Sequence, residues 1–214
     1  MKILVYNNLT NKMETFNKDL NSPMPYTKDK YLSVKEFRGS SKSNILWTTR
    51  AAMDAFNKLR TLYGKPIKVG YAFKRIAEGG HAGMSQHYAG VAFDIAQGMP
   101  AAQRDKIRNL AIKYKMFTYV EPKILTPTWV HVDKRDPTPA CPTGGYPLIK
   151  YRKKGVYVAV LQDALNVLKY NPGAIDAIFG KSTKSAVINF QKANNLTPDG
   201  IVGCNTWRAI TNKI

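Results

Sequence analysis

The chain has 214 residues, a formal net charge of +19 and a hydrophobic content of 44%. This length accommodates one large domain or two small ones, and the hydrophobic content excludes a disordered chain. The excess of lysine and arginine predicts an anionic partner, such as nucleic acid, anionic lipid or an acidic bacterial wall. The basic residues are spread along the chain rather than gathered in a tail, which weakens the nucleic-acid interpretation.

Three further features concern the compartment. No apolar run approaches the 18 residues of a membrane span, so none is expected. The first eight residues hold an apolar patch too short for a secretory signal, which predicts a mature chain or release by a phage- or prophage-type route. Cys141 and Cys204 lack the spacing of metal ligands, and they are either two unpaired thiols or one bridge formed outside the cell.

Strands and helices alternate in the first two-thirds of the chain. The polar residues 1–36, interrupted by prolines, are expected to form an arm over the domain that follows. The spacing of apolar residues predicts the type of each remaining element, and glycine or proline residues mark the ends of the helices. Helices are predicted over residues 45–63 and 100–114, and strands over residues 3–6, 67–73, 117–121 and 129–133.

Proline and glycine mark a boundary late in the chain. The segment from Asp136 to Pro147 inclusive contains four prolines and two glycines, which predicts a linker. Beyond it apolar residues recur at helical spacing, and we expect three helices. The predicted divisions are a larger N-terminal domain with its arm over 1–139, a linker over 140–150 and a helical module over 151–214.

Two histidines and one aspartate form the candidate metal site. His87 and Asp94 are seven residues apart around Gly90, and His131 lies on a predicted strand. Two neutral imidazoles and a carboxylate suit catalytic zinc, because the fourth position stays open for water. The alternative, a facial triad of non-haem iron built on His131 and Asp133, normally places its lone histidine downstream, and no histidine follows His131.

The general base is assigned from an assumed strand pairing. If Glu121 pairs with Trp129 in an antiparallel hairpin, Glu121, His131 and Asp133 share one face. Glu121 is then the candidate base, and Asp133 would hold an imidazole in one tautomer. A register slip of one residue would turn Glu121 away, so an ordinary strand-end role for Glu121 stays open.

Three more residues are candidates for binding substrate. A peptide with a free carboxylate needs a cation in the cleft, and Arg75 is one of the two cations nearest in sequence, beside Lys74. His81 lies close enough in sequence to line the cleft, although it could be a loop histidine without a role. Ser85 either contacts substrate or caps a turn.

Residues 30–135 resemble the zinc D-Ala-D-Ala carboxypeptidase and endolysin peptidase family, which shares its fold with the hedgehog signalling domain. The resemblance lies in Ser85-x-His87-x-x-Gly90-x-Ala92-x-Asp94 and the later Trp129-x-His131. It implies that His87, Asp94 and His131 bind Zn²⁺ and that Ser85 contacts substrate. The chain departs from the family in two places. Many members have an acidic residue three positions before the last ligand or a histidine two positions before it, where this chain has Thr128 and Trp129. Members also often have an arginine after a Gly-Tyr pair, where this chain has Ala72. Arg75 is the candidate to replace that arginine.

The C-terminal residues resemble a three-helix peptidoglycan-binding domain. The match includes Leu161-Gln162, Phe190-Gln191, Asp199-Gly200 and Thr206-Trp207, with Ala177 standing where a glycine is expected. Together the two resemblances imply an α+β fold, with a small antiparallel sheet and flanking helices of the hedgehog or DD-peptidase type, followed by an all-α module.

The expected function is that of a monomeric, extracellular zinc peptidase that cleaves stem peptides of peptidoglycan near D-Ala and binds the anionic wall. The departures at Thr128 and Ala72 leave open a wall-binding protein whose peptidase-like domain is not catalytic. Salt-sensitive DNA binding without affinity for walls is a third possibility.

Overall fold

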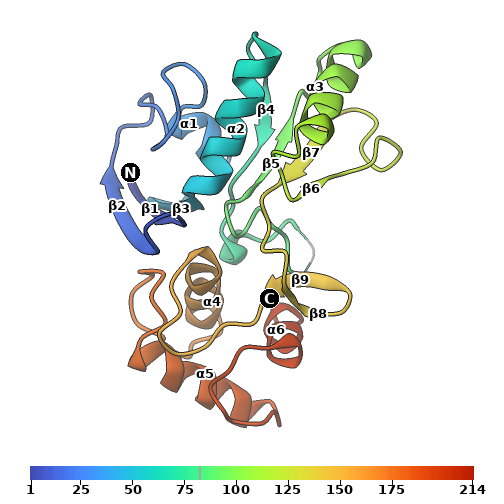
Figure 1. Ribbon diagram of the computed structural model, residues 1–214. Coiled ribbons are helices and arrows are strands. Elements are labelled where there is room, and N and C mark those ends of the chain that lie inside the picture. Colours follow the sequence, from blue (N-terminus) through green and yellow to red (C-terminus); the bar gives the residue numbers. More distant parts are fainter. Residues whose placement is uncertain (82) are drawn as a thin grey trace.

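A four-stranded antiparallel sheet carries the candidate site in the computed structural model, which describes residues 1–81 and 83–214 (Figure 1). Its strand order is β4-β5-β7-β6, and the strands are β4 (Val69–Tyr71), β5 (Ala92–Ile95), β7 (Val130–Asp133) and β6 (Tyr119–Val120). Along β7, Val130 and Val132 are buried in the core. Because side chains alternate across a strand, His131 and Asp133 face the opposite side.

Two helices pack near the apolar side of this sheet, α2 (Arg50–Tyr63) and α3 (Ala101–Lys113). Phe56 of α2 lies 5.0 Å from Phe93 of β5 between ring centroids. Helix α2 begins after Thr49, whose side chain accepts a hydrogen bond from the Ala52 amide, and it ends at Gly64 in the left-handed conformation.

The prediction that this helix begins near residue 45 is wrong, because α2 begins at Arg50. Residues Ile45–Thr49 form strand β3, which pairs in parallel with β1 (Lys2–Asn7). This run contains β-branched and aromatic side chains, which favour a strand, and its pairing partner lies some 40 residues away, beyond the reach of local periodicity. Strand β2 (Lys12–Asn17) completes a sheet of order β2-β1-β3.

Residues 1–36 are therefore more ordered than the predicted arm. The strand expected over residues 3–6 is confirmed by β1, whereas β2 and the short helix α1 (Val34–Arg38) were not predicted. Ser33 and Glu36 form a capping box at the start of α1. A 3₁₀ turn, η1 (Ile76–Glu78), precedes the segment that carries His87.

The C-terminal residues are helical, as expected, with α4 (Val156–Val167), α5 (Lys181–Ala193) and α6 (Cys204–Thr211). Two buried glutamines organise the loops between them. Gln162 accepts hydrogen bonds from the amides of Asp176 and Ala177, and Gln191 accepts one from the amide of Gly200. Ala177 takes a positive φ of 60°, which explains why a glycine suits this position.

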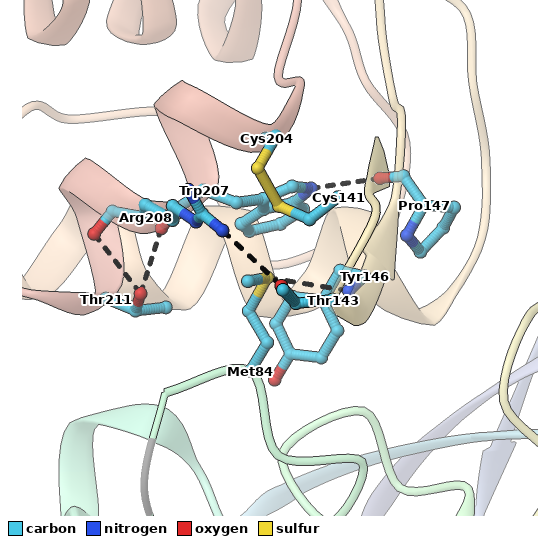
Figure 2. Close-up of a disulfide and its surroundings, with 9 residues drawn as sticks. All are labelled: Met84, Cys141, Thr143, Tyr146, Pro147, Cys204, Trp207, Arg208 and Thr211. Carbon is cyan, nitrogen blue, oxygen red and sulfur yellow. Dashed lines mark hydrogen bonds between the residues drawn. A yellow bond between two sulfur atoms is a disulfide. The ribbon is translucent and has the colours of Figure 1, made fainter. Parts of the chain in front are cut away.

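The segment predicted as a linker contains ordered structure. Strands β8 (Pro139–Cys141) and β9 (Gly144–Pro147) form a hairpin, and Cys141 is joined by a disulfide to Cys204 at the start of α6 (Figure 2). The Trp207 indole N–H donates to the Pro147 carbonyl at 2.9 Å. The hairpin is thus fixed to the helical module by one covalent bond and one buried hydrogen bond.

Removing the disulfide should destabilise this part of the protein. The two cysteines are 63 residues apart in sequence, and a crosslink across a loop of that size restricts the unfolded chain by about 4 kcal/mol in the chain-entropy description. We expect the double variant Cys141→Ser/Cys204→Ser to unfold at a lower urea concentration than the parent protein. An unchanged urea midpoint would show that the bridge does not contribute to stability.

Among the described residues, no helix combines the length and apolar character needed to cross a bilayer.

Candidate metal centre

His87, Asp94 and His131 converge at one point on the polar face of the four-stranded sheet. One nitrogen or oxygen atom from each lies within 4.8 Å of the others. Asp94 on β5 pairs directly with His131 on β7, while His87 comes from the turn between η1 and β5. His87 Nε2 lies 3.4 Å from Asp94 Oδ2, and His131 Nδ1 lies 2.7 Å from Asp94 Oδ1.

This donor set fits a divalent cation such as zinc. Ligand atoms about 2.0–2.2 Å from a tetrahedral zinc ion are roughly 3.3 Å apart, close to the His87–Asp94 separation of 3.4 Å. The set supplies two imidazoles and one carboxylate, the composition of several catalytic zinc sites. The side chains of Asp94 and His131 are 15% and 14% exposed, so the centre is shielded yet reachable from solvent.

The orientation of His87 is fixed by a backbone carbonyl. His87 Nδ1 lies 3.1 Å from the Ala72 oxygen, which can only accept, so Nδ1 carries the proton and the Nε2 lone pair is free to bind a cation. The indole N–H of Trp47 donates to the Tyr88 carbonyl and the Thr48 hydroxyl to the Gly90 carbonyl. Strand β3, which the sequence did not reveal, thus anchors the turn after His87.

His131 is held between two carboxylates. Its Nε2 lies 3.3 Å from Asp133 Oδ2, on the opposite side of the ring from Asp94. Burial alone would lower the pKa of His131, but the hydrogen bonds to Asp133 and Asp94 outweigh it and raise this pKa to about 9. Burial opposes ionisation of Asp94, yet its hydrogen bonds to His131 and His87 hold its pKa below the usual range.

Asp133 is itself fixed by an arginine. It is fully buried and is bound by the Arg135 guanidinium, with Nε 2.7 Å from Oδ1. Burial raises the pKa of Asp133, but its bonds to Arg135 and His131 bring it below the usual value. Arg135 also lies over the Tyr119 ring, 4.2 Å from the centroid. A chain of contacts from Tyr119 through Arg135 and Asp133 therefore orients His131.

A cavity of about 310 Å³ opens beside the centre. It is lined by His81, Met84, Ser85, Gln86, His131, Arg135 and Gly145. Ser85 and His81, the predicted substrate-binding residues, both lie on its wall. Arg135 was not predicted, although an arginine two residues after Asp133 in a strand-ending segment could have been considered as a cation for the cleft.

His81 stacks on His87 with ring centroids 4.8 Å apart. Burial and the proximity of His87 lower the pKa of His81 to about 4, so its ring is neutral near pH 7. Tyr71 contacts both imidazoles, with its ring centroid 4.7 Å from that of His81 and 4.9 Å from that of His87. The buried Tyr71 hydroxyl has no hydrogen-bond partner among the described residues, and the sequence analysis did not single it out.

Arg75 lies in a different environment from the one expected of a substrate-binding cation. Its Nε donates to Asp163 Oδ1 at 3.0 Å, and Asp163 is a fully buried residue of α4. This ion pair joins η1 to the helical module. Since Arg75 neutralises a buried carboxylate, it is not a free cation for substrate, and Arg135 is the arginine that lines the cavity.

Glu121 pairs in a different register from the one assumed. Tyr119 pairs with Asp133, and the Glu121 amide donates to the His131 carbonyl at 3.0 Å, so Glu121 lies opposite His131 rather than Trp129. The shift is two residues, which leaves Glu121 on the same face as His131 because strand side chains repeat every two residues.

Gly90 is required by close packing in the turn after His87. Its φ is +66°, and a Cβ added there would lie 2.0 Å from the Trp47 carbonyl oxygen and 3.3 Å from the Phe73 ring. Neither partner is free to move, because both are buried in the core. The glycine therefore permits the turn to lie directly on β3.

Replacing Gly90 with alanine should destabilise the fold by about 3 kcal/mol or more, since backbone strain and a contact with fixed backbone combine. Thermal unfolding of Gly90→Ala would measure the loss. Gly79→Ala is the matched control, because Gly79 has a similar φ of +60° with nothing within 4 Å of an added Cβ. Equal losses in the two variants would contradict the packing explanation.

One comparison with known proteins concerns the C-terminal module. Residues 154–210 match the family model described as a putative peptidoglycan binding domain. The chain is also 42% identical over 69 residues to a protein of Kitasatospora aureofaciens described as "Uncharacterized protein in bpoA1 3'region". That match covers 30% of this chain and 58% of the other protein. The domain match indicates association with the cell wall.

Proposed function

We propose that this protein is a zinc-dependent peptidoglycan peptidase that hydrolyses stem-peptide bonds near D-Ala and is brought to the wall by its C-terminal module. The observation that carries the proposal is the convergence of His87, Asp94 and His131 beside an open cavity, in the same chain as a match to a peptidoglycan-binding domain.

The proposed roles follow from the contacts of each side chain. His87 Nε2, Asp94 and His131 Nδ1 would hold the cation. When bound, a divalent cation such as zinc polarises a carbonyl and acidifies water. Asp133 keeps the Nε2 proton of His131 in place, and Arg135, Ser85 and His81 line the space for the peptide.

The hydrolysis itself needs a proton acceptor. In the proposed reaction water adds to the peptide carbonyl carbon, the C–N bond breaks, and the leaving amine takes up a proton. Glu121 is the proposed base that removes a proton from water and returns it to the amine. It lies on the His131 face of the sheet, next to His131 in the strand pairing.

Attachment to the wall would serve the chemistry in two ways. A bound module raises the local concentration of the peptidase at its polymer. The net charge of +19 also attracts the protein electrostatically to an anionic wall. We propose that the protein acts outside the cytoplasm, at the wall, as phage- or prophage-type lytic enzymes do.

Digestion of purified walls tests the proposal. Walls from several chemotypes are incubated with the zinc-loaded protein, with chelator-treated protein and with chelator-treated protein supplied again with zinc. We expect free amino groups only where zinc is present, and mass spectrometry of the muropeptides identifies the bond and separates carboxypeptidase from endopeptidase action. Bound zinc without new amino groups on any wall would instead indicate a non-catalytic wall-binding protein.

A further inference from the structure

The residues just before His87 are held by the C-terminal part of the chain. Met84, Ser85 and Gln86 are consecutive, all three line the cavity, and the next residue is a candidate ligand. Each of them makes a contact with a residue between Gly145 and Tyr157. The position of this segment therefore depends on residues that the sequence places outside the peptidase domain.

Hairpin β8–β9 provides the first set of these contacts. The Tyr146 hydroxyl donates to the Ser85 carbonyl at 2.7 Å, and the Tyr146 amide donates to the Met84 sulfur at 3.5 Å (Figure 2). Tyr146 is fully buried, with its ring 5.0 Å from that of Trp207. Tyr146 of the hairpin therefore contacts both the helical module and the segment that lines the cavity.

Helix α4 provides the second set. The Tyr157 hydroxyl donates to Gln86 Oε1 at 3.0 Å, and Gln86 Nε2 donates to the Gly145 carbonyl at 3.3 Å. Both ends of the Gln86 amide are therefore bound by the C-terminal part of the chain. The same Tyr157 oxygen accepts from the Asp136 amide at 3.0 Å, which ties α4 to the segment after β7.

The Arg75–Asp163 ion pair lies at the same interface. It joins the turn that precedes the cavity segment to α4. A freely moving tether would not need a fully buried carboxylate paired across its boundary, because burying a charge is costly unless the partner is fixed. The contacts through Arg75, Tyr146 and Tyr157 indicate one rigid unit around the cavity.

We propose that the C-terminal module is a structural part of the substrate cleft and that Tyr146 and Tyr157 are positioning residues for the segment from Met84 to Gln86. The module then has two roles, wall attachment and support of the cleft, and the effect on cleavage rests on the proposed peptidase function. Substrates too small to need wall attachment should also depend on these tyrosines.

Hydrogen exchange in the metal-free protein tests the structural part without any activity. In Tyr157→Phe and Tyr146→Phe, we expect the backbone amides of residues 85–91 to exchange about 3- to 10-fold faster than in the parent protein. Tyr151→Phe is the matched control, since Tyr151 is an exposed tyrosine of the same module. Unchanged exchange in both cleft variants would overturn the proposal. If Tyr146→Phe does not fold, Tyr157→Phe decides.

Cleavage of a short soluble stem peptide tests the functional part. We expect kcat/KM to fall about tenfold in Tyr157→Phe, with unchanged zinc content and unchanged retention on walls. In a Gln86→Leu background the same substitution should have no further effect, because Tyr157 acts through Gln86. Additive losses, or parental kcat/KM, would contradict the proposal. If the parent protein cleaves no peptide, the proposed function fails, and the exchange rates still decide whether the module supports the cleft.

Discussion

Replacing His131 with alanine is expected to reduce wall hydrolysis by at least about 10³-fold while retention on walls stays unchanged. The substitution removes one of three ligands, and two ligands hold zinc far more weakly than three. The wall-binding match lies at residues 154–210, away from β7, so attachment to the wall should not depend on His131. Release of amino groups and co-sedimentation with walls measure the two properties separately.

His81→Ala is the matched control for this variant. His81 is a histidine of the same cavity that stacks on His87, yet it is not among the three converging ligands. We expect His81→Ala to retain zinc and His131→Ala to lose it. Retained hydrolysis in His131→Ala would remove His131 from the site.

The two carboxylates near His131 should give different results when each is replaced by its amide. Glu121→Gln is expected to lower kcat by about 10²- to 10⁴-fold with zinc still bound, because the amide cannot accept a proton. Asp133→Asn is expected to weaken zinc affinity by about 10- to 100-fold, because Asp133 orients the His131 ring. The two variants thus separate proton transfer from ligand orientation.

Zinc titration of the metal-free variants, together with kcat for the zinc-loaded variants, distinguishes these effects. Asp133→Asn removes the buried negative charge that pairs with Arg135, so the thermal unfolding of this variant must be followed as well. A parental kcat in Glu121→Gln would exclude Glu121 as the base. A large fall in kcat for zinc-loaded Asp133→Asn would assign the proton transfer to Asp133 instead.

The sequence was sufficient for the parts of the structure that local patterns determine. Alternating residues predicted the strand that carries His131, and the helical spacing after residue 151 predicted the C-terminal helices. The spacing of His87, Gly90 and Asp94 pointed to a turn, whereas strand β5, which carries Asp94, was not predicted. The three ligand candidates then meet because Asp94 and His131 are cross-strand partners.

The remaining features depend on contacts between distant residues. Local periodicity predicts helix where strand β3 lies, because the partner of β3, strand β1, is far away in sequence. The alternation of side chains shows which residues share a face but not the register of β6 against β7. The predicted partner of Glu121 is therefore two residues from the residue that lies opposite Glu121 in the sheet. Arg75 was assigned to substrate by nearness in sequence, whereas its partner Asp163 is 88 residues away.

The composition of residues 140–150 predicts a linker but does not predict whether that linker is ordered. Proline and glycine indicate an interruption of regular structure, but they do not show whether the segment moves freely. Here the segment forms a hairpin that Cys141–Cys204 fixes to α6, and Tyr146 of this hairpin reaches the cavity. The sequence left the pairing of the two cysteines open, because two residues 63 positions apart carry no information on their distance in space.

Anomalous diffraction at the zinc edge, from crystals grown with one equivalent of zinc, tests the central claim most directly. We expect one strong peak per chain, about 2.0–2.2 Å from His87 Nε2, an Asp94 oxygen and His131 Nδ1. A peak bound by other residues, or no peak between these three side chains, would contradict the assignment of a metal-dependent hydrolase.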